Sequence, residues 1–183
     1  LLIMRAYHND KGNHNKNTIL IPDSAHGTNP ASVSGVGWKT VVVKSKDGCI
    51  DIEDLKKKIT PDVAGLMLTN PNTLGLFEKD ILEISDLIHS VDGLMYWDGA
   101  NANAIMGFMK PGKTGFDIAH INVHKTFSTP HGGGGPGAGP VGVIEKLVDY
   151  LPIPRITKKN NTYNLSHNFE NSVGKVHSFY GNV

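Results

Sequence analysis

Short apolar segments alternate along this chain with segments in which apolar residues recur every third or fourth position. The first kind predicts buried strands, because these segments are rich in Val, Ile and Leu and end abruptly at polar residues. The predicted strands are residues 18–22, 39–44, 63–69, 93–97, 117–123 and 140–144. The second kind predicts helices that pack one face on a core. The predicted helices are residues 1–8 (the end of one), 31–35 (the opening of one), 52–60 after the capping residue Asp51, 78–90 and 145–150.

Strands that alternate with helices are typical of α/β proteins. We therefore expect an α/β fold with a mostly parallel sheet and helices on both faces. A chain of 183 residues suits one domain with a real core. This domain is expected to span residues 1–150, because from Leu151 the pattern gives way to Pro, Lys and Asn. Residues 151–183 are expected to be a connection toward a further, C-terminal domain.

Composition narrows the class of protein. A formal net charge of +1, without a cluster of basic and aromatic residues, gives no reason to expect a nucleic-acid or membrane partner. The single cysteine, Cys49, excludes an internal disulfide and a cysteine-rich zinc site. No apolar segment approaches the roughly 20 residues that cross a bilayer, and the first residues do not match a secretory signal. These observations favour a soluble protein of the cytoplasm.

Polar residues follow four of the predicted strands. They are His26, Asn70, Asp98 and the pair His124 and Lys125. Ligands of parallel sheets bind outside the carboxyl ends of the strands, so these side chains are expected to share one rim. Each has an ordinary structural explanation, such as a turn for Asp98 or Asn70 and a backbone hydrogen bond for His26. Their coincidence at one rim favours a functional site.

Lys125 and Asp98 suggest a division of chemical roles. Lys125 is expected at the end of a buried strand, where desolvation favours the neutral amine that attacks carbonyl groups. Pyridoxal phosphate enzymes combine such a lysine with a carboxylate that keeps the pyridine nitrogen protonated. Hydroxyl and glycine residues of the segment 126–137 are available for the phosphate. The alternatives are a lysine that extends to water and a non-catalytic scaffold.

Three other kinds of site have weaker support in the sequence. Residues 132–137 fit the G-x-G-x-x-G pattern of dinucleotide sites, but a proline interrupts it and no convincing helix follows. The glycines after His131 resemble an esterase oxyanion loop, but no serine has the G-x-S-x-G context. His26, His120, His124 and His131 do not have the spacing of a zinc signature, so we expect no metal.

Four motifs carry a resemblance to a known family. They are residues 24–32 (SAHGTNPAS), 69–73 (TNPNT), 98–101 (DGAN) and 124–140 (HKTFSTPHGGGGPGAGP). Together they closely resemble the glycine cleavage system P-protein, the pyridoxal-phosphate-dependent glycine dehydrogenase (decarboxylating). Residues 172–182 resemble subunit 2 of its two-subunit bacterial form.

The resemblance implies the large domain of the aspartate aminotransferase-like (type I) fold. It implies that Lys125 forms the covalent imine with pyridoxal 5'-phosphate and that Asp98 pairs with the pyridine nitrogen. His26 would stack on one face of the ring, as a catalytic and cofactor-binding residue, and Ala100 would pack on the other. The remaining implied cofactor-binding residues are Asn70, near the ring hydroxyl, Thr28 and His124.

The implied reaction is decarboxylation of glycine, with transfer of the aminomethyl group to lipoate on the H-protein. The implied assembly is a heterotetramer with partner subunit 1. Family members carry a phosphate-binding segment before residue 1 and a small domain after residue 183, so we expect the chain to be truncated at both ends. We also expect it to bind the cofactor weakly and to lack decarboxylase activity alone. The alternatives are another type I aminotransferase or decarboxylase, and a scaffold fragment.

Overall fold

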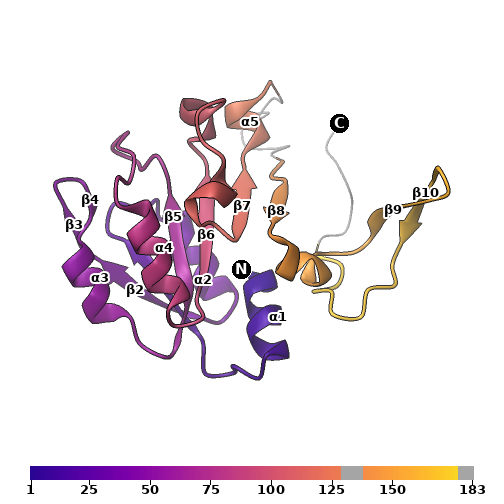
Figure 1. Ribbon diagram of the computed structural model, residues 1–183, viewed down its shortest axis with the longest axis horizontal. Coiled ribbons are helices and arrows are strands. Elements are labelled where there is room, and N and C mark those ends of the chain that lie inside the picture. Colours follow the sequence, from indigo (N-terminus) through magenta and orange to yellow (C-terminus); the bar gives the residue numbers. More distant parts are fainter. Residues whose placement is uncertain (129–137, 177–183) are drawn as a thin grey trace.

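The computed structural model describes residues 1–128 and 138–176 (Figure 1). Its α-helices are α1 (Leu2–Asp10), α2 (Thr28–Gly35), α3 (Ile52–Lys58), α4 (Ile81–His89) and α5 (Val123–Thr126). Its 3-10 helices are η1 (Ala102–Ile105), η2 (Pro111–Thr114) and η3 (Glu145–Tyr150). Its strands are β1 (Thr18–Pro22), β2 (Lys39–Val43), β3 (Ser45–Lys46), β4 (Cys49–Ile50), β5 (Val63–Thr69), β6 (Leu94–Gly99), β7 (Ile118–Ile121), β8 (Val141–Val143), β9 (Arg155–Lys159) and β10 (Thr162–Ser166).

Six strands form the central sheet, in the order β2-β1-β5-β6-β7-β8. The first five of these are parallel to their neighbours, and β8 runs antiparallel to β7 at one edge. The predicted mostly parallel sheet is therefore confirmed. Because β1, β5, β6 and β7 are adjacent and parallel, their carboxyl ends meet at one rim of the sheet.

Helices cover both faces of this sheet. In β6, Met95 and Trp97 point into one hydrophobic core, whereas Leu94 and the half-buried Tyr96 contact the other, as the period of two in a strand requires. The first core also contains residues of α3 and α4, for example Leu55 and Ile84. The second contains residues of α1, α2 and η3, namely Met4, Val33 and Leu147 among others. The expected two-sided cover is confirmed.

The predicted start of one helix is confirmed and that of another is wrong. Asp51 caps α3 as expected, since its Oδ1 accepts hydrogen bonds from the backbone N–H groups of Glu53 and Asp54. Helix α4 begins at Ile81, later than the predicted residue 78. The reason is that Glu78 is buried: its carboxylate accepts from the Ile50 N–H, and its own N–H donates to the side chain of Asn70.

Residues beyond 150 contain an antiparallel hairpin that the apolar pattern did not predict. Strands β9 and β10 pair through five residues each, and Figure 1 shows this hairpin to one side of the central sheet. Helix η3, just before it, is fixed to the domain, because the Tyr150 hydroxyl donates to Asp10 at 2.6 Å. The division of the chain near residue 150 stays a prediction. Within the described ranges, none of the helices has the length and apolar character needed to cross a membrane.

The buried His8 predicts a specific dependence of stability on pH. Its side chain is fully buried in α1, its Nε2 lies 2.9 Å from the Ala64 carbonyl oxygen, and burial lowers its pKa below the ordinary 6.5. The unfolded chain therefore takes up a proton near pH 6.5 that the folded chain resists. The contribution of His8 to stability is expected to fall as the pH falls from about 7.5 to about 5.5, with a slope of at most about 1.4 kcal/mol per pH unit.

Denaturant unfolding at several pH values checks this expectation. His8→Gln should flatten the profile between pH 7.5 and pH 5.5, within the ordinary range of histidine titration, roughly one unit either side of 6.5. His14→Gln, at an exposed histidine, is the matched control and should leave the profile unchanged. Variants must be compared because Glu78 also contributes to the profile. Burial raises the pKa of its carboxyl, so its contribution to stability rises as the pH falls, opposite to that of His8. An identical slope in wild type and His8→Gln would contradict the assignment.

Candidate active site

A polar cavity of about 510 Å³ lies at the carboxyl ends of β1, β5, β6 and β7. Its volume is in the range of small-molecule and cofactor sites. It is lined by His26, Thr28, Asn29, Ser32, Met67, Thr69, Thr73, Tyr96, Asp98, Ala100, Asn101, His120, Asn122, His124 and Lys125. Six of the seven predicted site residues are in this set, and Asn70 is the exception. The shared cavity that the strand ends predict is therefore present.

Asp98 is the buried charge of the cavity. It is the penultimate residue of β6, at the rim, and only 6% of its surface is exposed. Oδ2 accepts from the Thr69 hydroxyl at 2.9 Å and Oδ1 accepts from the Ala100 N–H at 3.1 Å. Burial alone would raise the carboxyl pKa, but the interactions with His120, Thr69 and Ala100 outweigh it and hold the pKa below 3.8. Asp98 is thus an anion at neutral pH, available to a cationic group in the cavity.

Lys125 and His124 both reach the cavity from α5. The prediction that Lys125 ends a buried strand is wrong: β7 stops at Ile121, Asn122 breaks the strand, and Lys125 follows in a short helix. Lys125 is exposed rather than desolvated. Its amine lines the same cavity as the Asp98 carboxylate and can be reached from solvent. The position of the amine therefore agrees with a role in the site, although the expected cause of its reactivity does not.

His26 and Thr28 enter the cavity from the loop after β1 and the first residue of α2. The backbone N–H of Thr28 donates to His26 Nδ1 at 3.1 Å, which orients the exposed imidazole. Asn29 and Ser32, also from α2, line the cavity beside them. This end of α2 therefore presents small polar groups and the histidine ring to the same space as Asp98.

Asn70 does not line the cavity. It is fully buried at the end of β5, where its Oδ1 accepts from the Glu78 N–H and its backbone carbonyl accepts from the Trp97 indole N–H. These contacts hold the rim together beneath the site. The proposed contact of Asn70 with a ring hydroxyl stays a prediction that the geometry of the cavity does not favour.

Nine lining residues were not identified as site residues from the sequence. They are Asn29, Ser32, Met67, Thr69, Thr73, Tyr96, Asn101, His120 and Asn122. Burial raises the pKa of the Tyr96 hydroxyl far above its usual value, so this phenol stays protonated. Thr69 and His120 contact Asp98 directly, at 2.9 Å and 3.5 Å. A signal did exist, since both lie in predicted strands next to the strand of Asp98, but the strand register was needed to use it.

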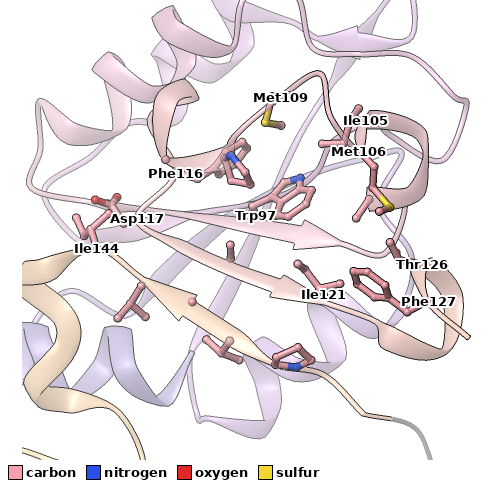
Figure 2. Close-up of a pocket in the computed structure, with 18 residues that line it drawn as sticks. Trp97, Ile105, Met106, Met109, Phe116, Asp117, Ile121, Thr126, Phe127 and Ile144 are labelled. Carbon is pink, nitrogen blue, oxygen red and sulfur yellow. The ribbon is translucent and has the colours of Figure 1, made fainter. Parts of the chain in front are cut away.

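A second cavity, about 570 Å³, has a different character. Figure 2 shows Trp97, Phe116 and Ile121 lining this groove on the opposite side of the sheet. Of the described residues that line it, only Asp117 carries a charge, and its carboxylate already accepts from the Met95 N–H at 2.8 Å and lies 2.8 Å from His89 Nε2. The groove therefore offers apolar surface and little chemistry.

Part of the sequence prediction cannot be placed. Residues 129–137, which include His131 and most of the glycine-rich motif expected near the cofactor phosphate, lie outside the described residues. Within 1–128 and 138–176, no three His, Cys, Asp or Glu side chains gather in a way that could hold a metal ion.

Comparisons with known proteins show what the chain is similar to. No family model matches the chain. Over 183 residues it is 57% identical to a Treponema denticola protein named probable glycine dehydrogenase (decarboxylating) subunit 2, and over 182 residues it is 57% identical to the Thermotoga maritima protein of the same name. The resemblance to the glycine cleavage P-protein is confirmed. All of the chain is aligned in both cases, but it spans only 38% of the length of each of these relatives.

Solved structures agree on the fold. The crystal structure of glycine decarboxylase (P-protein) of the glycine cleavage system, in inhibitor-bound form, superposes with a TM-score of 0.70 at 21% identity, covering 86% of this chain and 35% of that chain. An aromatic aminotransferase from Pyrococcus horikoshii gives a TM-score of 0.61 at 20% identity, covering 81% of this chain and 41% of that chain. These identities show the fold alone, and the expected aminotransferase-like (type I) fold is confirmed.

Proposed function

We propose that this chain is the pyridoxal-phosphate-binding part of a glycine dehydrogenase (decarboxylating). The observation that carries the proposal is that Lys125, Asp98, His26 and Ala100, which come from three different strand ends, line one cavity of suitable size. The reaction is the loss of the glycine carboxylate as carbon dioxide and the transfer of the aminomethyl group to a lipoylated H-protein. A partner subunit 1 completes the enzyme, as the names of the relatives suggest.

The residues of the cavity fit this cofactor in their chemistry. Asp98 supplies a buried carboxylate that can accept from a protonated ring nitrogen, and Lys125 supplies an accessible amine for the aldehyde carbon. When bound, pyridoxal phosphate delocalises the electron pair that decarboxylation leaves behind. The chain's own part is to hold the ring between His26 and Ala100, with Thr28 and His124 beside it, and to keep a negative charge at the nitrogen.

Hydrogen bonds to Asp98 explain why its carboxylate keeps its charge although it is buried. A carboxylate in an apolar cavity would tend to take up a proton, and it would then be a poor partner for a pyridinium. Hydrogen bonds from Thr69 and the Ala100 N–H offset that cost, so the acceptor is ionised before a ligand arrives. The site is therefore electrostatically preorganised for a cationic ring nitrogen.

Substrate exchange tests this function. The purified chain is saturated with pyridoxal phosphate, mixed with an amino acid and reduced with borohydride, and the products are separated by mass spectrometry. Before reduction, glycine should displace Lys125 from the aldehyde carbon, so that borohydride then traps the cofactor as free phosphopyridoxyl-glycine rather than on the protein. Alanine should leave most of the label on the protein.

The outcomes separate the candidate functions. Preferential exchange with glycine supports the glycine dehydrogenase. Equal or better exchange with larger L-amino acids would replace it with another type I aminotransferase or decarboxylase. Absence of any covalent label at saturating cofactor would contradict a pyridoxal phosphate site in this cavity.

A further inference from the structure

Asp98 lies in a row of three polar residues that crosses the sheet at one level. Its partner in β5 is Thr69 and its partner in β7 is His120. Directly paired residues of neighbouring strands point to the same face of a sheet, and all three of these line the polar cavity. The carboxylate is thus flanked on both sides by groups able to donate a hydrogen bond.

Thr69 is oriented as a donor by a fourth residue. The amide Nδ2 of the buried Asn29 donates to the Thr69 hydroxyl oxygen at 3.5 Å, and that hydroxyl donates to Asp98 Oδ2 at 2.9 Å. Because an amide nitrogen can only donate, the proton of the Thr69 hydroxyl remains for Asp98. The arrangement links α2 to the carboxylate through β5 and leaves a second lone pair of Oδ2 open.

His120 approaches the other carboxylate oxygen. Its Nδ1 lies 3.5 Å from Asp98 Oδ1, and its ring centroid lies 6.3 Å from that of Tyr96. This nitrogen is buried and forms no hydrogen bond within the part of the chain that the structure describes. Among the described groups, Asp98 Oδ1 is thus the acceptor that this nitrogen faces, and a small closure of the gap would complete a hydrogen bond.

We propose that Thr69 and His120 are positioning residues that hold the Asp98 carboxylate in one rotamer and keep it charged for a protonated ring nitrogen. The part of this inference that concerns the ring rests on the proposed function. Neither residue touches the reacting atoms; both act through Asp98. The free lone pair of Oδ2 is the place where the ring N–H would be accepted.

The first test measures the carboxyl pKa of Asp98 by carbon-13 NMR on the chain without cofactor. Thr69→Val, which removes the donor, should raise this pKa by roughly 1–2 pH units, since a hydrogen bond to a charged group has this effect. His120→Leu should raise it by a smaller amount because of the longer contact. Thr69→Ser, which keeps the hydroxyl, should restore the wild-type value. Asp117, a second buried carboxylate, serves in the same spectra as a control for the fold.

The second test measures the affinity for pyridoxal phosphate against pH. In Thr69→Val and His120→Leu, the pH below which affinity is lost should shift to a higher value, by the same amount as the Asp98 pKa. An unchanged Asp98 pKa in both variants, with the Asp117 signal intact, would overturn the positioning role. If the Asp98 pKa shifts but the pH at which affinity is lost does not, the proposed role of these two residues in binding the ring nitrogen is overturned. If wild type binds no cofactor, the proposed function fails and the NMR comparison alone decides the positioning role.

Discussion

Lys125→Ala is expected to abolish the covalent attachment of pyridoxal phosphate to this chain. Lys125 is the only lysine among the described residues that line the polar cavity, and its amine is exposed. Its removal leaves no lysine amine among the described residues that line the cavity, whereas the Asp98 carboxylate and its hydrogen bonds are untouched. The measurement is the absorbance of the lysine–cofactor adduct during titration, followed by borohydride reduction and peptide mapping.

The comparison needs a matched lysine elsewhere. Lys113, exposed in η2 and outside the polar cavity, provides it, and Lys113→Ala should retain the full label. Lys16 is not a rival target, because it is buried and its Nζ donates to the carbonyl oxygens of Pro61 at 3.2 Å and Val63 at 3.0 Å. Retention of the label in Lys125→Ala, or its loss in Lys113→Ala, would remove Lys125 from the assigned role.

The strand ends account for most of the candidate site that the sequence predicted. Parallel strands must present their carboxyl ends at one rim, so His26, Asp98 and Lys125 could be grouped without coordinates. Thr69 and His120 could not, because their contact with Asp98 depends on the register between neighbouring strands. Register is set by the packing of whole strands and is not visible in any one segment. The Asn70 side chain accepts from the N–H of Glu78, eight residues away, a contact that the sequence does not reveal, so the role of Asn70 in the site stays a prediction.

The errors in the elements predicted from the apolar pattern also have physical causes. In the hairpin of β9 and β10, strand β10 alternates polar and apolar residues and β9 has one apolar residue, but these apolar side chains stay exposed, with Ile156 at 74% and Leu165 at 63%. A search for buried segments therefore passes over it. The turn at Asn160 and Asn161, both with positive φ, was the available signal, since this pair of conformations is typical of two-residue hairpin turns. Lys125 was placed in the wrong environment because the apolar character of residues 117–123 continues past the actual end of β7.

Gly65→Ala is expected to destabilise the fold strongly. Gly65 lies within β5, the strand between β1 and β6 in the sheet, and a Cβ atom there would lie 2.1 Å from the Leu94 carbonyl oxygen and 2.5 Å from Met4 Cε. The first contact is with backbone of the paired strand, so rotamer changes cannot relieve it. Separating β5 from β6 would break the ladder that carries Thr69 and Asp98 to the cavity.

Gly65→Ala should therefore cost about 3 kcal/mol or more, a large part of the roughly 5–15 kcal/mol that stabilises a typical domain. Urea unfolding of purified protein measures the change in free energy. Gly142→Ala is the matched control: it also lies in a strand of the central sheet, but nothing lies within 4 Å of its added Cβ. It should stay within about 0.5 kcal/mol of wild type. If the two variants were equally stable, the close approach of β5 and β6 at Gly65 would not be a constraint on this fold.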